Sequence, residues 1–168
     1  GKAQPLSPGG QFGYFPSISR QGHRLVYSEQ TYDTDIWRLD LSPAPSGRPS
    51  ALTRLIFSSR REDTPNFSPD GKRVVFSSNR SGHWEIWVCD SDGQNSVQLT
   101  SFGGSYVTGT PRWSPDGKTI VFDSGPRGKP DIFVINPESR VQQNPIASTH
   151  ADFVPSWSRD GRWIYFCS

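Results

Sequence analysis

The sequence predicts an all-β fold, a β-propeller built from four-stranded antiparallel blades. Its main support is a stretch that starts at Pro65 and contains Ser-Pro-Asp-Gly, which recurs from Pro111 and Pro155 and, in a weaker form, from Pro16. Repeats of 44 to 49 residues are typical of propellers and related arrays. The chain also has 16 glycines and 15 prolines, which suit many tight turns, and 12% aromatic residues, which exclude a disordered tail.

The chain is expected to form a single propeller segment over residues 1–168. Each complete repeat has turn signals that separate four short strands. The repeats span approximately 12–57, 58–104, 105–148 and 149–168, and residues 1–11 could supply an outer strand to a neighbouring blade. We expect strands at 16–19, 24–28, 35–40 and 50–53 in the first repeat, 85–90 and 97–100 late in the second, and 131–136 and 144–147 late in the third.

The repeated turn has a clear chemical basis. In Ser68-Pro69-Asp70-Gly71, proline presets φ at the second position, aspartate suits the third, and glycine accepts a positive φ. The serine hydroxyl can bond the backbone amides of the turn, which predicts a structural and not a catalytic serine, since the sequence has no G-x-S-x-G elbow. The corresponding turn residues are Ser114, Pro115, Asp116, Gly117, Ser158, Asp160 and Gly161, with Ser19 in the weaker copy.

The second strand of each repeat is apolar on both faces, as in 74–76 and 120–122. A sheet with one solvated face would alternate apolar and polar residues, so both faces should be covered by neighbouring blades. Trp37, Trp87 and Phe133 recur on the third strands and are expected to fill the gaps between blades. A stack of aromatic rings that binds a sugar or a base is the alternative.

Composition argues against several other classes of protein. A net charge of +2 is too small to predict nucleic-acid binding, and no apolar run approaches the roughly 18 residues that span a bilayer. Cys89 and Cys167 are expected to be buried free thiols. His23, His83 and His150 lie in unrelated contexts without metal-ligand spacing.

The S-P-D-G-K motif, with a flanking P-x-[FW], a [DE]-I-[WF] strand and a terminal L-T, resembles the TolB-type β-propeller repeat. The resemblance covers about residues 12–168; the departures are Arg20-Gln21 and Arg159 in the turns, and Pro145 in an outer strand. Propellers of this kind occur in the bacterial periplasmic protein TolB, beside the catalytic domain of prolyl-oligopeptidase-type enzymes, and in sensor domains of winged-helix transcription regulators. The sequence contains no segment that resembles a hydrolase or a winged helix.

About three and a half repeats are present, whereas propellers usually close with four to eight blades. The chain is therefore expected to be part of a longer propeller, or to pair with a second copy. In the second case residues 4–7 of one copy would add a strand to the incomplete last repeat of the other.

The default binding site is the face that carries the longer loops, which join the second and third strands and lead into each new blade. Glu62, Asp63 and Asp152 precede inner strands and could point to the mouth of the axial channel. Carboxylates that converge there could hold Ca²⁺, although the third repeat has Thr108-Gly109-Thr110 instead; capping and hydrogen bonding within the loops is the alternative. No resident cofactor is expected.

The resemblance implies a non-enzymatic scaffold that binds protein partners or senses a ligand. The alternatives are an accessory propeller of a peptidase and a sensor domain of a transcription regulator. The resemblance favours the periplasm, with the cytoplasm as the alternative. Because function depends on sites placed on a fold, the motif is more informative about fold than about activity.

Overall fold

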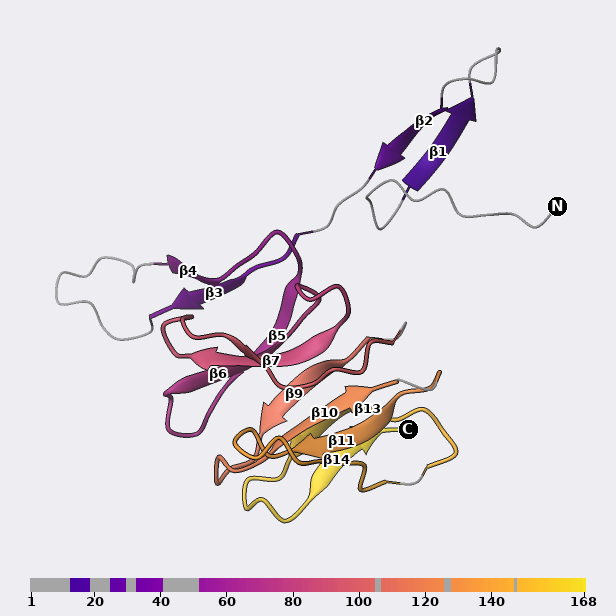
Figure 1. The fold of residues 1–168 in the computed structure, drawn as a ribbon. Helices are drawn as coiled ribbons and strands as arrows, with labels where there is room; N and C mark the ends of the chain where they lie inside the picture. The colour runs from indigo at the N-terminus through magenta and orange to yellow at the C-terminus, as the bar shows by residue number, and fades with distance from the viewer. Residues whose placement is uncertain are drawn as a thin grey trace. The chain divides into compact units, whose positions relative to one another are not determined.

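The computed structural model describes residues 13–18, 25–29, 33–40, 52–104, 107–125, 128–146 and 148–168, the first two ranges as backbone only. The chain divides into two compact units, Gly1–Asp33 and Thr34–Ser168 (Figure 1). In the first unit, β1 (Gly13–Ile18) pairs antiparallel with β2 (Leu25–Glu29), and the register slips between Tyr14 and Ser17.

The second unit consists of antiparallel strands that pair in sequence order, and its described residues include no helix. Two four-stranded sheets have the orders β5-β6-β7-β8 and β9-β10-β11-β12, while β3-β4 and β13-β14 are two-stranded. This arrangement confirms the predicted all-β fold with four-stranded antiparallel blades. The bounds are β3 Ile36–Leu39, β4 Leu52–Ile56, β5 Glu62–Phe67, β6 Arg73–Ser78, β7 Glu85–Asp90, β8 Val97–Gln98, β9 Gly109–Trp113, β10 Ile120–Ser124, β11 Asp131–Ile135, β12 Gln142–Gln143, β13 Phe153–Trp157 and β14 Ile164–Cys167. No helix in the described part of the chain is long and apolar enough to cross a membrane.

The outer strands are the least accurately predicted elements. The third repeat was expected to have its outer strand at 144–147, but β12 is Gln142–Gln143, immediately before that range. Pro145 has no amide hydrogen to give to β11, and the side chain of Asn144 accepts the amide of Ile146 at 3.1 Å instead. After Gln143 the chain therefore leaves the sheet, and the Asn144 side chain bonds the backbone there in place of a neighbouring strand.

The repeated turn has the geometry that its residues predict. The amide of Gly71 donates to the carbonyl of Ser68 at 2.9 Å, and Gly71 has a φ of +69°. The hydroxyl of Ser68 accepts the amide of Arg73 at 2.9 Å and donates to Asp70 at 2.6 Å. The other two described turns repeat this pattern, with Gly117 and Gly161 at +70° and +71°. The serines at these positions are thus turn residues.

We expect Gly117→Ala to lower the free energy of unfolding by about 1 to 2 kcal/mol, because a side chain resists positive φ. The added Cβ would also meet Cδ of Pro69, in the preceding turn, at 3.6 Å, an ordinary contact. Urea unfolding measures the loss. Gly109→Ala is the matched control, because Gly109 lacks a positive φ and its Cβ would make a similar 3.6 Å contact, with Val107. Equal losses in the two variants would contradict the conformational explanation.

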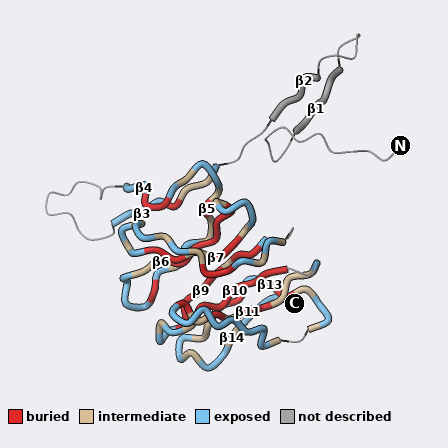
Figure 2. Tube along the Cα trace, viewed as in Figure 1, coloured by how far each residue is buried: buried red, intermediate tan, exposed pale blue. Residues whose placement is uncertain are grey.

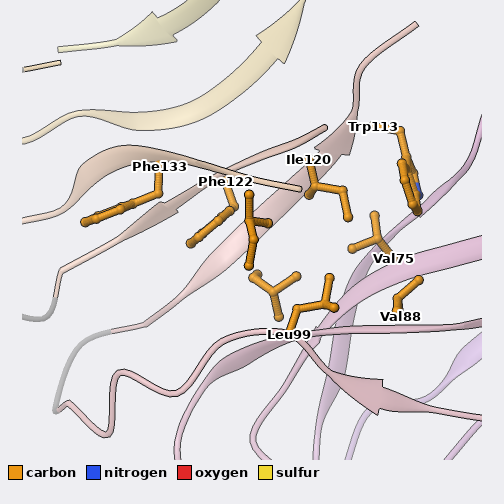
Figure 3. Close-up of a cluster of buried hydrophobic side chains, with 9 residues drawn as sticks. Val75, Val88, Leu99, Trp113, Ile120, Phe122 and Phe133 are labelled. Carbon is orange, nitrogen blue, oxygen red and sulfur yellow. The ribbon is translucent and has the colours of Figure 1, made fainter. Parts of the chain in front are cut away.

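Buried residues are concentrated on the central strands of the complete sheets (Figure 2). One apolar cluster joins the two four-stranded sheets (Figure 3). It includes Val75 and Val88 from the β5–β8 sheet and Trp113, Ile120 and Phe122 from the β9–β12 sheet. A second cluster joins β3 and β4 to β6 and β7, and it includes Val74 and Phe76. Adjacent residues of β6 therefore face different clusters, which confirms that neighbouring sheets cover both faces of this strand.

The predicted interblade aromatic residues differ in burial. Phe133 is 9% exposed and stacks on Phe122 with ring centroids 5.7 Å apart, and Trp87 packs against the second cluster. Trp37 was expected to be buried as well, but it is 53% exposed, because on β3 its neighbour Ile36 faces the second cluster and Trp37 does not. Both cysteines are free, as predicted; Cys89 is buried, whereas Cys167 is exposed on the two-stranded β13-β14 sheet, contrary to expectation.

Candidate functional site

The face where β5, β9 and β13 begin carries a backbone irregularity in the second, third and fourth repeats. The residue directly before the recurrent proline has positive φ, at 52° for Thr64, 45° for Thr110 and 51° for Val154. The pairing of β5 and of β13 slips at this point, as in a β-bulge. Residues before proline already disfavour helical conformations, so the neighbouring structure must hold this backbone in place. Bulges re-aim side chains and are frequent beside functional sites.

Three equivalent residues stand three positions before these prolines, and all are buried. Glu62 and Thr108 are each 1% exposed, and Asp152 is 0% exposed. Oε1 of Glu62 accepts the hydroxyls of Ser58 at 2.7 Å and Ser78 at 3.1 Å. The hydroxyl of Thr108 bonds that of Ser124 at 2.7 Å, across the equivalent strand pair. The position is therefore polar and enclosed within the sheet packing.

Arg80 balances the buried charge of Glu62. Its Nη2 lies 3.0 Å from Oε1 of Glu62, and the side chains are 19% and 0% exposed. The guanidinium also lies 5.1 Å from the ring centroids of both Phe76 and Trp87. An ion pair so far removed from water is costly to break, because either partner alone would be a buried charge. Glu62 thus anchors the chain that follows β6 to the start of β5.

The other two predicted binding residues have different surroundings. Asp63 is half-buried, accepts the hydroxyl of Thr34 at 3.2 Å and pairs with Arg61 at 3.1 Å. Asp152 keeps both carboxylate oxygens buried without a hydrogen-bond partner in the structure, while its amide donates to the carbonyl of Pro130 at 2.9 Å. In the described residues, no hydrogen bond or ion pair joins Asp152 to Glu62 or Asp63. The contacts of Glu62 and Asp63 fit the capping alternative.

Asp123 is a further residue of this site, and the sequence did not predict its role. One of its oxygens, Oδ2, accepts the hydroxyl of Thr110 at 2.6 Å and the amide of Val154 at 2.7 Å. The carboxylate thereby holds two of the positive-φ residues, on β9 and on β13, and connects successive repeats. Burial raises its pKa, although the hydrogen bonds act in the opposite direction. A carboxylate after the apolar run of β10, where the preceding repeat has Ser77, was the available sequence signal.

Asp123 should make stability depend on pH. Its pKa is above the ordinary value of 3.8, so between that value and its folded-state pKa the folded protein binds more protons than the unfolded chain. The contribution of Asp123 to stability is therefore expected to fall as pH rises from about 4 through this window. Urea unfolding of wild type and Asp123→Asn from pH 3.5 to 7 tests this. The wild-type free energy minus that of the variant should decline with pH; a constant or increasing difference would contradict the prediction.

Among the described residues of Thr34–Ser168, two carboxylates that lie close together could coordinate a metal ion. Carboxylate oxygens of Asp35 and Glu62 lie within 4.8 Å of each other, and each residue has one buried oxygen without a partner. Arg54 and Arg80 already pair with these two carboxylates at 2.6 and 3.0 Å. Of the three histidines, His83 and His150 are exposed, and His23 lies outside the described residues. The site can therefore be neutral without a cation.

No protein-family model matches the chain. A TolB homologue of Chlorobaculum tepidum is 35% identical over 103 residues, and one of Chlorobium chlorochromatii is 41% identical over 101 residues. These alignments cover 59% and 57% of this chain, but only 24% and 23% of the relatives. The chain spans about a quarter of the length of the curated relatives it matches.

Solved structures show the same fold. TolB of Acinetobacter baumannii matches with a TM-score of 0.60 and 24% identity, over 90% of this chain and 36% of that protein. A puromycin-hydrolysing peptidase of Mycobacterium tuberculosis matches with a TM-score of 0.58 and 16% identity, over 90% of this chain and 24% of that one. With the sequence relatives, these similarities confirm the resemblance to TolB-type propeller repeats. At such identities the structures are informative about fold alone.

Proposed function

We propose that this chain, a segment of a TolB-like β-propeller, is a non-enzymatic scaffold for protein–protein interaction or ligand sensing. The observation that carries the proposal is that the repeated serines use their hydroxyls in hydrogen bonds within their own turns. Ser68, Ser114 and Ser158 each donate to the aspartate two residues ahead at 2.6 Å, so these hydroxyls are held as turn supports. Within the described residues no serine hydroxyl bonds a histidine ring nitrogen, the pairing that activates a nucleophile.

Assays of the purified chain on ester and peptide substrates test the non-enzymatic role. We expect no turnover above a buffer blank. Reproducible turnover that is lost on changing a single serine would overturn the proposal. The alternative is an accessory propeller that filters access to the catalytic domain of a peptidase, and the structural similarity to a peptidase is the observation in its favour. A hydrolase with a G-x-S-x-G elbow on the same gene would favour this alternative, and an upstream winged helix would favour a transcriptional sensor.

The proposed partner is a protein bound at the loop-rich face where β5, β9 and β13 begin. The positive-φ residues there support this choice, because strained backbone is concentrated at functional sites. The small net charge of +2 supports a partner other than nucleic acid. The TolB-like repeats suggest a bacterial protein of the periplasm, with the cytoplasm as the alternative.

Self-association is a separate proposal. Phe153, Trp163, Tyr165 and Phe166 are between 38% and 61% exposed on or beside β13 and β14. A neighbouring blade would cover them, whether it comes from the same polypeptide or from a second copy. Light scattering at low micromolar concentration distinguishes these cases. A mass of about twice 18.8 kDa supports a second copy, and a folded monomer contradicts it.

No resident cofactor is proposed. Because Arg54 and Arg80 already neutralise Asp35 and Glu62, we expect that EDTA leaves the thermal midpoint unchanged and that millimolar Ca²⁺ raises it by less than about 1 °C. Thermal unfolding followed by circular dichroism measures both. A midpoint that rises with Ca²⁺ concentration, and does so less in Glu62→Gln, would instead establish a cation site.

A further inference from the structure

A pocket of about 380 Å³ lies between the Ser-x-Asp-Gly turns of the third and fourth repeats. These turns are at the opposite end of the strands from the loop-rich face. Its lining combines an aromatic ring, that of Trp157, with the carboxylates of Asp116 and Asp160; the remaining lining residues are Ser114, Pro115, Thr119 and Gly161. The two turns are stacked, since a Cβ on Gly161 would lie 3.6 Å from Cδ of Pro115. The pocket is therefore bounded by adjacent turns of the repeat.

The equivalent position one repeat earlier is occupied by a cation from the chain itself. Arg73 follows the turn of the second repeat, and its guanidinium carbon lies 4.7 Å from the ring centroid of Trp113. Its Nη1 pairs with Oε1 of Glu138 at 2.6 Å. Trp113 is 6% exposed. Between the turns of the second and third repeats, the place equivalent to the pocket is thus filled by an arginine that lies over a tryptophan.

Thr119 stands where Arg73 would stand in the next repeat, and Trp157 stands where Trp113 would stand. Threonine is short and uncharged, so it cannot extend over the indole. The Trp157 ring is nevertheless held in place, because Nε1 donates to the carbonyl of Arg112 at 3.3 Å. The change from arginine to threonine therefore accounts for an open pocket with a positioned aromatic wall.

The carboxylates of the pocket are ionised and partly free. Oδ1 of Asp116 accepts the hydroxyl of Ser114 at 2.6 Å and the amide of Lys118 at 3.1 Å, and these bonds lower the pKa of Asp116. Asp160 has the same two bonds in the next turn, with the same direction of pKa change. Among the described residues, the hydrogen bonds of both aspartates go to Oδ1 and none goes to Oδ2, so Oδ2 remains available to a ligand.

We propose that this pocket binds a guanidinium group, the arginine side chain of a partner polypeptide, which takes the place that Arg73 occupies one repeat earlier. The planar group would lie over Trp157 and donate to the free oxygens of Asp116 and Asp160. Arginine suits the site better than lysine, because its flat, weakly hydrated cation stacks on an aromatic face and forms paired hydrogen bonds with carboxylates. The site needs only these side chains and does not depend on the proposed function.

NMR titration with N-acetyl-arginine amide at constant ionic strength tests the proposal. A single side chain should bind with a dissociation constant in about the millimolar range, so the readout is the indole N–H resonance of Trp157, assigned with Trp157→Phe. We expect a saturable shift, and at least about threefold weaker binding of N-acetyl-lysine amide. The absence of a saturable shift up to about 50 mM, or equal binding of the two compounds, would overturn the proposal.

Two substitutions, each of which gives one repeat the residue of the other at this position, serve as matched variants. Thr119→Arg should fill the pocket with the chain's own guanidinium and abolish the Trp157 response, while circular dichroism shows an unchanged fold. Arg73→Thr should create a second site, seen as a saturable shift of the Trp113 indole. Binding that is unchanged in Thr119→Arg, or no Trp113 response in folded Arg73→Thr, would contradict the proposal.

Discussion

Replacing Phe122 with alanine is expected to remove about 3 to 5 kcal/mol from the free energy of unfolding, the largest effect that we predict. Phe122 is fully buried on the central strand β10, and its ring lies 5.7 Å from that of Phe133 and 6.2 Å from that of Phe102. Truncation would leave a cavity in the cluster that joins the two complete sheets. The sheets cannot close it easily, because β10 is hydrogen-bonded on both edges, to β9 and to β11.

Urea unfolding with a common slope for wild type and variant measures this loss. Val141→Ala is the matched control, because Val141 is an apolar side chain that is 57% exposed; it should cost less than about 0.5 kcal/mol. A loss of under about 1 kcal/mol for Phe122→Ala would mean that the two sheets do not share this cluster. That result would contradict blade-on-blade packing as the main source of stability.

The fold was predictable because the same local chemistry recurs at a regular spacing. Ser68, Pro69, Asp70 and Gly71 specify one turn by their own preferences, and its repetition identifies the strands on either side. Burial on both faces of β6 and β10 also followed from their continuous apolar runs. These features depend on residues that are close in sequence, so the sequence alone is sufficient to predict them.

The candidate site was less predictable because it depends on residues from different strands. By its sequence position Glu62 could point to the mouth of the axial channel; in the structure it is buried, and Ser58, Ser78 and Arg80 bond one of its oxygens. The positive φ of Thr64 had no local signal, since a residue before proline normally avoids that region. Tertiary contacts determine both the burial of Glu62 and the positive φ of Thr64, so residues close in sequence do not predict them.

The pocket between the third and fourth repeats depends on a position at which equivalent repeats carry different residues. The turn residues that recur between repeats predicted the fold, but the difference between Arg73 and Thr119 distinguishes the two pairs of adjacent turns. This difference becomes meaningful only when the side chain of Arg73 is seen over Trp113. In a repeat protein, then, positions that differ between equivalent repeats are the ones to examine for binding.

Replacing Glu62 with alanine should lower the free energy of unfolding by about 2 to 4 kcal/mol. The Arg80 guanidinium, 19% exposed, would lose its countercharge, and the Ser58 and Ser78 hydroxyls would lose their acceptor. The range is below that of a fully buried pair, because water reaches part of Arg80 and because Phe76 and Trp87 still face its guanidinium. Urea unfolding at pH 7 and low salt gives the value.

The neighbouring pair supplies the control. Asp63 and Arg61 lie 3.1 Å apart with side chains 32% and 39% exposed, so Asp63→Ala should cost less than about 1 kcal/mol. A double-mutant cycle of Glu62→Ala with Arg80→Met then isolates the buried pair, and the double variant should be more stable than Glu62→Ala alone because no unpaired charge remains. If Glu62→Ala and Asp63→Ala cost the same, Glu62 is not a structural anchor. Its carboxylate would then be free to act as the binding group that its sequence position first suggested.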